Sequence, residues 1–143
     1  MKLTQISVFL ENKKGRLYDA CSTLGKSSIN IRALTVAESE DFGVLRMVVD
    51  RPDAAAKALK KDGFVASFTE IVAVEVGDRP GGLAGILKVL DKNGVNIEYM
   101  YGFVEKSSDM ALMVFRFDDP DAAIKVLLKN KVRVVGKKEI GEI

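Results

Sequence analysis

The chain contains no histidine and only one cysteine among its 143 residues. Histidine is the commonest general base near neutral pH and a frequent metal ligand, so its absence removes the usual route to both chemistries. The single thiol, Cys21, cannot form an internal disulfide and falls on the apolar face of a predicted helix, where we interpret it as a small core residue. The sequence also has no nucleophile–base pair, metal-ligand cluster or Walker-type phosphate loop. We therefore expect no catalysis, no cofactor and no metal.

An excess of charge of one sign is also missing. The 22 basic and 20 acidic residues give a net charge of +2, which supplies no field suited to nucleic acid or to an anionic membrane. No apolar run approaches the roughly 20 residues that span a bilayer. The first five residues alternate like a strand and do not form a signal peptide. We expect neither a nucleic-acid nor a membrane partner, and a cytoplasmic location.

What the chain does contain is an internal repeat. The segment 12–17 matches 78–83 at an offset of 66 residues, and 29–31 matches 95–97 at the same offset. Further along, 50–55 matches 118–123 at an offset of 68, so one two-residue insertion reconciles the copies. A common period over nearly the whole chain indicates duplication. We predict two domains, 1–69 and 70–143, each so small that it packs on the other or on a second chain.

Hydrophobic periodicity gives the same order of elements in each half. Strands alternate apolar residues at every second position, and helices repeat them at every third and fourth position. The first half reads as strands at 3–10, 29–37, 44–50 and 64–69, with helices at 15–27 and 52–62. The second half reads as strands at 71–77, 95–104, 110–118 and 132–139, with helices at 80–92 and 120–130. This βαββαβ order predicts an α+β, ferredoxin-like fold in which two helices cover one face of an antiparallel sheet.

A strand-to-helix elbow, Asp78-Arg79-Pro80-Gly81-Gly82-Leu83, organises the second half. Pro80 fits the first turn of a helix, where a missing N–H is no loss. The two glycines leave the amides of that turn open, and exposed helix N-terminal amides attract an anionic group such as a carboxylate. Asp78 has two interpretations, a helix N-cap or a partner for a ligand ammonium.

The elbow, its helix and the following Gly94-Val95-Asn96-Ile97 resemble the ACT domain, and the whole chain resembles a tandem ACT pair over about 3–70 and 71–140. The first copy is degenerate, with Lys14 in the place of the proline and Ser28 in the place of a glycine. The resemblance implies two ACT units side by side, a free amino acid bound at the interface between them, and regulation of an enzyme of amino-acid metabolism. The ligand-binding residues that it implies are Asn12, Gly15, Leu17, Asn30, Asp78, Arg79, Gly81, Gly82, Leu83 and Asn96.

Some relatives that sense serine carry another polar residue two positions before the elbow residue. Here those positions hold Leu10 and Val76, which favours a medium-to-large side chain over serine. Asn30 and Asn96 have an alternative role in backbone bonding where the turn ends, and Arg79 has one as a solvated charge.

The sequence also indicates two protein partners, a second copy of the chain and an enzyme. Apolar residues such as Phe9 and Val44 alternate onto the sheet face opposite the helices, either as ordinary exposed aliphatic and aromatic residues or as a contact surface. We predict a homodimer. The alternative to a sensor is an interaction protein or regulatory subunit of an amino-acid-metabolism enzyme that works without a ligand.

Overall fold

The computed structural model describes residues 1–38, 41–104 and 110–141 and divides the chain into two compact units. The N-terminal unit comprises Thr4–Thr69, and the C-terminal unit comprises Glu70–Ile143 together with Met1–Leu3. Each unit is described by itself below.

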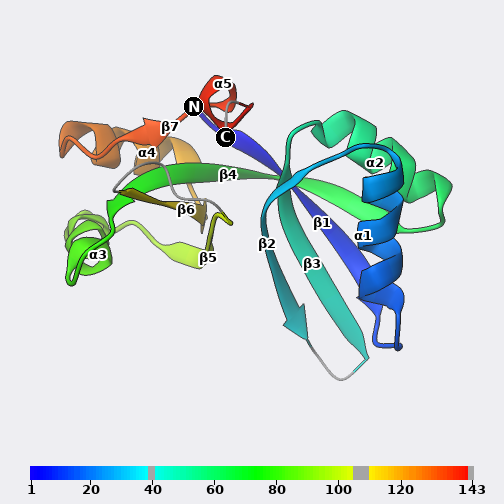
Figure 1. The fold of residues 1–143 in the computed structure, drawn as a ribbon. Coiled ribbons are helices and arrows are strands. Elements are labelled where there is room, and N and C mark those ends of the chain that lie inside the picture. The colour runs from blue at the N-terminus through cyan, green and yellow to red at the C-terminus, as the bar shows by residue number, and fades with distance from the viewer. Residues whose placement is uncertain (39–40, 105–109, 142–143) are drawn as a thin grey trace. The chain divides into compact units, whose positions relative to one another are not determined.

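The N-terminal unit places two helices against one face of an antiparallel sheet (Figure 1). Its elements are β1 (Leu3–Glu11), α1 (Arg16–Lys26), β2 (Ile31–Glu38), β3 (Phe42–Val49), α2 (Pro52–Lys61) and the start of β4 (Val65–Gly77). The strand order is β2-β3-β1-β4.

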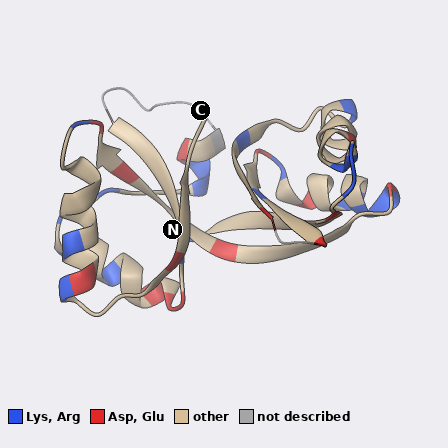
Figure 2. Ribbon diagram, turned by 90° about the horizontal axis from the view of Figure 1, so that it is seen from below, with Lys and Arg blue, Asp and Glu red and all other residues tan. Residues whose placement is uncertain are grey.

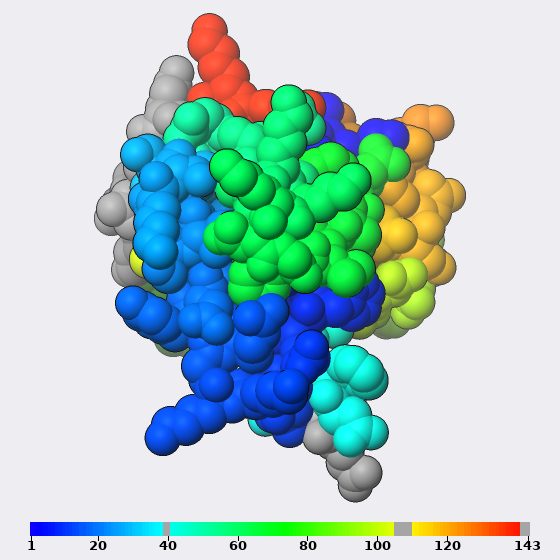
Figure 3. Space-filling model, turned by 90° about the vertical axis from the view of Figure 1, so that its right-hand side faces the viewer, coloured from blue at the N-terminus to red at the C-terminus, as the bar shows by residue number. Residues whose placement is uncertain are grey.

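Side chains from β1 and β3 that point toward the helices form the core of this unit. Ile6, Val8 and Leu45 are fully buried and pack with Leu24 of α1 and Leu59 of α2. The same alternation of apolar residues that predicts the strands therefore selects the face that the helices cover. Figure 3 shows α1 in blue beside α2 in blue-green.

The C-terminal unit repeats this plan. It contains the rest of β4, then α3 (Gly82–Lys92), β5 (Ile97–Gly102), β6 (Met110–Phe117), α4 (Pro120–Lys129), β7 (Val134–Val135) and α5 (Lys137–Gly141). The strand order is β7-β4-β6-β5, and every pairing is antiparallel. Its core joins Val72 and Val74 of β4 with Phe115 of β6, Leu90 of α3 and Leu127 of α4. The predicted ferredoxin-like fold class is thus confirmed.

The predicted elements differ from the structure at two places. Strands expected at 64–69 and 71–77 form one continuous strand, β4, because the sequence between them has no residue that interrupts pairing. The strand expected at 132–139 is limited to Val134–Val135, and α5 follows it. Alternation of apolar residues stops at Val135-Gly136, and the amide of Ile140 bonds to the carbonyl of Gly136 at 3.2 Å, which closes a helical turn.

Charged residues of both signs are spread over the helices and strand ends of the ribbon (Figure 2). Within the described residues, no helix has the length and apolar character that crossing a membrane requires. The same part of the chain has no group of three acidic or cysteine side chains placed to hold a metal ion.

Candidate functional site

Helix α3 begins at Gly82, after an N-cap residue, Gly81, whose φ of 81° lies in the left-handed region. Glycine adopts this conformation without the steric cost that a Cβ would add. Gly15 does the same before α1, with a φ of 90°. Neither N-cap is made by a side chain, so the interpretation of Asp78 as the cap is wrong. Pro80 precedes the N-cap, so its expected place in the first helical turn is also wrong.

Backbone hydrogen bonds tie the two elbows in the same way. The Lys13 amide donates to the Glu11 carbonyl at 2.7 Å, and the Arg79 amide donates to the Gly77 carbonyl at 2.9 Å. The Gly82 amide donates to the Arg79 carbonyl at 3.0 Å. The expectation that this amide stays open is therefore wrong. Position 82 requires glycine for a different reason, because a Cβ there would lie 2.0 Å from the Gly77 carbonyl oxygen.

A cavity of about 400 Å³ lies beside the second elbow; we call it the elbow cavity. Its wall combines the end of β4, the elbow, the first turn of α3 and the start of β6. The lining residues are Val76, Gly77, Asp78, Arg79, Pro80, Leu83, Ala111 and Met113. The register brings these segments together, because Val76 lies opposite Ala111 in the β4–β6 pairing. A volume of this size falls within the range of small-molecule sites.

The elbow cavity offers both signs of charge beside an apolar wall. Asp78 supplies a carboxylate, and the next residue, Arg79, supplies a guanidinium that can form paired hydrogen bonds with a carboxylate. Val76, Leu83 and Met113 supply the apolar surface. A free amino acid presents the matching set of an ammonium, a carboxylate and a side chain.

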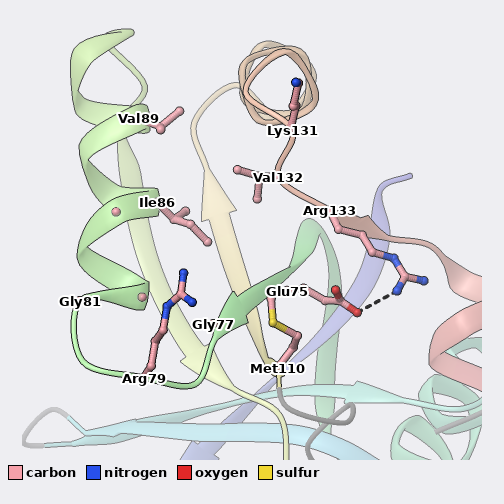
Figure 4. A pocket seen from close by; sticks show the side chains of 12 residues that line it. Glu75, Gly77, Arg79, Gly81, Ile86, Val89, Met110, Lys131, Val132 and Arg133 are labelled. Carbon is pink, nitrogen blue, oxygen red and sulfur yellow. Dashed lines mark hydrogen bonds and ion pairs between the residues drawn. The ribbon is translucent and has the colours of Figure 1, made fainter.

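A second cavity of about 450 Å³ lies on the other side of the elbow, along α3; we call it the helix cavity. Figure 4 shows Arg79 projecting into it from the elbow, with Ile86 and Val89 on α3 and Val132 facing them. At its far edge Arg133 pairs with Glu75, with 2.9 Å between Nη1 and Oε1.

The structure brings together only part of the predicted ligand-binding set. Asp78, Arg79 and Leu83 line the elbow cavity, and Arg79, Gly81 and Gly82 line the helix cavity. The other predicted residues line neither cavity, namely Asn12, Gly15, Leu17, Asn30 and Asn96. Asn30 and Asn96 are exposed residues just before β2 and β5. The amide of Asn30 donates to the Asp50 carboxylate at 3.2 Å.

Sequence reasoning missed the residues that β6 contributes, Ala111 and Met113. Their pairing with β4 decides their position, and no local pattern reveals a pairing register. It also missed Glu75, Val132 and Arg133 of the helix cavity. A comparison of the two copies could have pointed to the helix cavity. Arg16 and Phe64 of the first copy correspond to the smaller Gly82 and Val132 of the second.

Comparisons with known proteins place this geometry in a family. The sequence model of the ACT domain pair matches residues 1–143. A solved structure of a protein from Bacteroides thetaiotaomicron is 40% identical, with a TM-score of 0.93 over 100% of this chain and 98% of that one. A comparison with curated proteins gives no match.

The regulatory subunit of aspartate kinase from Thermus thermophilus is 18% identical, with a TM-score of 0.63 over 88% of this chain and 91% of that one. Its counterpart from Thermus flavus is 17% identical, with a TM-score of 0.59 over 88% and 90% of the two chains. At this level of identity the likeness concerns the fold. The family match covers the whole chain, the repeat and the two βαββαβ units agree with it, and the protein therefore belongs to the ACT domain pair family.

Proposed function

We propose that this protein is a non-catalytic, cytoplasmic regulator that binds one free amino acid per chain at the second elbow. The observation that carries the proposal is the elbow cavity, which combines Asp78, Arg79 and an apolar wall within about 400 Å³. A zwitterion needs both charges, because an unpaired charge that loses its water is strongly penalised. The predicted location of the ligand at an interface between ACT units stays a prediction.

The lining of the elbow cavity supports an amino acid with a medium-to-large apolar side chain. Val76, Leu83, Ala111 and Met113 offer hydrocarbon contacts and no hydroxyl or amide group that would recognise serine. We expect binding to shift a conformational equilibrium that a partner enzyme of amino-acid metabolism detects.

The first elbow offers less to a zwitterion. Its cation, Lys13, is already paired with Glu11 at 2.9 Å, and this pairing holds the pKa of Glu11 below its usual value. In the second elbow Arg79 corresponds to Lys13, and Gly77 corresponds to Glu11. Arg79 therefore lies beside a glycine instead of a glutamate, and it has no ion pair within the described residues. We therefore assign the amino acid to the second elbow.

A thermal-shift screen of the twenty amino acids at millimolar concentration tests the proposal. Binding to the folded state alone stabilises it by RT ln(1 + [L]/Kd), about 2.7 kcal/mol at a hundred-fold excess over Kd. We expect one or a few amino acids to raise the melting temperature, and Asp78→Asn to remove the rise. A Lys88→Gln control removes a charge from an exposed α3 position that lines neither cavity. A screen without any shift would favour the alternative, an interaction protein that needs no ligand.

We also propose a homodimer formed through the sheet face opposite α1 and α2. Phe9 and Phe42 are 50% and 57% exposed there. They lie on neighbouring strands, since Phe9 pairs with Val44 and Phe42 with Glu11 in the β1–β3 register. Exposed aromatic residues grouped in this way are typical of contact surfaces.

A further inference from the structure

The helix cavity lies beside the second elbow, and two substitutions distinguish this region from its counterpart in the first copy. In the N-terminal unit the guanidinium of Arg16 lies over the Phe64 ring, with 4.4 Å between its Cζ and the ring centroid. The pair spans the space between the start of α1 and the segment after α2. The corresponding residues of the C-terminal unit are Gly82 and Val132, and both line the cavity. Smaller side chains at both positions leave the space open.

The charges around the helix cavity favour an anion. Three cationic side chains line it, Arg79, Lys131 and Arg133, against one carboxylate, that of Glu75. The Glu75 carboxylate is already bound to Arg133, and its side chain is only 12% exposed. Arg133 also forms an ion pair with Glu139, so two carboxylates already neutralise its charge. The Lys131 side chain points away from Ile86 and Val132 (Figure 4), which leaves Arg79 as the lining cation best placed to bind an incoming anion.

The rest of the wall is apolar and suits a short branched chain. Ile86 and Val89 face the cavity from α3, and Val132 faces them from the opposite side (Figure 4). Met110 closes the floor from β6. A volume of about 450 Å³ admits a ligand of six to eight heavy atoms with room to spare.

We propose that the helix cavity is a second ligand site, which binds a small branched aliphatic carboxylate that lacks an ammonium group. The carboxylate pairs with Arg79, and the chain packs on Ile86, Val89 and Val132. An ammonium group is excluded because Glu75, the one acid of the wall, is engaged with Arg133. This site goes beyond the amino-acid site of the elbow cavity. The two sites share Arg79, which lines both cavities, so the two ligands compete for its guanidinium, while Met110 and Met113 report on them separately.

The two methionines of β6 allow both sites to be observed in one experiment. Met110 lines the helix cavity and Met113 lines the elbow cavity. The chain has five methionines, so a spectrum of protein labelled with methyl-13C methionine is simple, and Met110→Leu and Met113→Leu assign the two signals.

The probe is 4-methylpentanoate, compared with leucine, which has the same carbon skeleton plus an ammonium group. We expect 4-methylpentanoate to shift the Met110 signal and leave the Met113 signal in place. Leucine should need a concentration at least about ten-fold higher for the same Met110 shift, because its ammonium would lie unpaired in the cavity. An unmoved Met110 signal up to about 10 mM probe, or equal responses to both probes, overturns the proposal.

Variants separate this site from the proposed amino-acid site. Val132→Phe introduces the ring that the first copy carries and should abolish the response of Met110, while Asp78→Asn should leave it unchanged. Arg79→Gln keeps the shape of the cavity and should weaken the carboxylate about ten-fold or more, and Lys88→Gln should not. A Met110 response that survives both Val132→Phe and Arg79→Gln, or that is lost in Asp78→Asn, contradicts the assignment. Failure of the amino-acid site would show instead at Met113 and leave these results intact.

Discussion

Gly82 controls how closely α3 approaches the end of β4. A Cβ at this position would lie 2.0 Å from the carbonyl oxygen of Gly77, far inside van der Waals contact. Neither atom belongs to a flexible side chain, so the backbone itself would have to move. The first copy has Arg16 at this position, which means that the tight junction is a property of the second elbow, the one that has both cavities.

Gly82→Ala should therefore lower the free energy of unfolding, by about 1–3 kcal/mol as for other overpacked sites. Urea denaturation measures the change. Gly85→Ala is the matched control on the same helix, because its Cβ would have no atom within 4 Å apart from its chain neighbours and the backbone of its own helix. Replacing glycine in a helix by alanine raises stability by about 1 kcal/mol at most. Equal effects of the two substitutions would show that the close approach at Gly82 is not a constraint.

Cys21 is half-buried in α1, and this burial raises the pKa of its thiol. Because only the thiolate reacts with alkylating reagents, labelling of the native protein should be slow at neutral pH. The midpoint of the rate-versus-pH profile should lie above that of an unperturbed cysteine, about 8.5. Unfolding the protein in urea should return the midpoint to that value. A native midpoint below it would mean that Cys21 is an activated thiol.

At the scale of single residues, the sequence was informative where a local motif determines position. The elbow motif led to Asp78, Arg79 and Leu83, which share one cavity. It could not lead to Met113, whose place depends on how β6 pairs with β4. The motif also misassigned the purpose of Gly82, because a close approach between α3 and β4 is visible only in three dimensions.

Helices α2 and α4 occupy equivalent places in the repeat, yet they begin differently. The Asp119 carboxylate accepts a hydrogen bond from the Ala122 amide at 3.1 Å and caps α4. Its counterpart at the start of α2 is Arg51, which makes no side-chain cap. Arg51 donates instead to the Ser27 carbonyl at 3.2 Å. The two copies therefore fix the second helix of each unit by different contacts.

Asp119→Ala should lower stability by about 1 kcal/mol, the usual contribution of an N-cap side chain. The measurement is the urea midpoint at a constant slope. Asp119→Ser serves as the control, because a serine hydroxyl can accept the same bond and should restore most of the loss. If serine and alanine destabilise equally, the hydrogen bond to Ala122 does not stabilise the protein.

Most elements follow directly from apolar periodicity, including all four long helices. The end of the chain does not follow from it. A strand is predicted over 132–139, but the chain forms a helical turn after Gly136 instead. Left-handed turns show the limits of reading residue types alone. Ser28 of the first copy, with a φ of 56°, takes the left-handed conformation that Gly94 takes in the second copy. Lys131 of the second copy takes the conformation that Gly63 takes in the first. The fold imposes these turns on residues that do not favour them.

Across the whole molecule, duplication has produced two units with one plan and different elbows. The first elbow pairs its cation with Glu11 and carries the Arg16–Phe64 contact. The second replaces Glu11 and Arg16 with glycines and has a cavity on each side. This difference between the elbows is the basis for the proposal that the second copy binds the ligands.

The proposed dimer gives a prediction for the intact protein. Phe9→Glu should convert a dimer into a monomer in light scattering at micromolar concentration, because it places a charge in the centre of the exposed aromatic surface. Tyr18→Glu is the control, since Tyr18 is also exposed but lies on α1. A wild-type protein that already has the mass of a monomer would rule the dimer out.

The most direct test of amino-acid binding is a titration of methyl-13C methionine protein with the best amino acid from the thermal screen. We predict a saturable shift of the Met113 signal at one ligand per chain, and its loss in Asp78→Asn but not in Lys88→Gln. An amino acid that stabilises the protein without moving Met113, or that moves it equally in Asp78→Asn, would contradict binding at the second elbow.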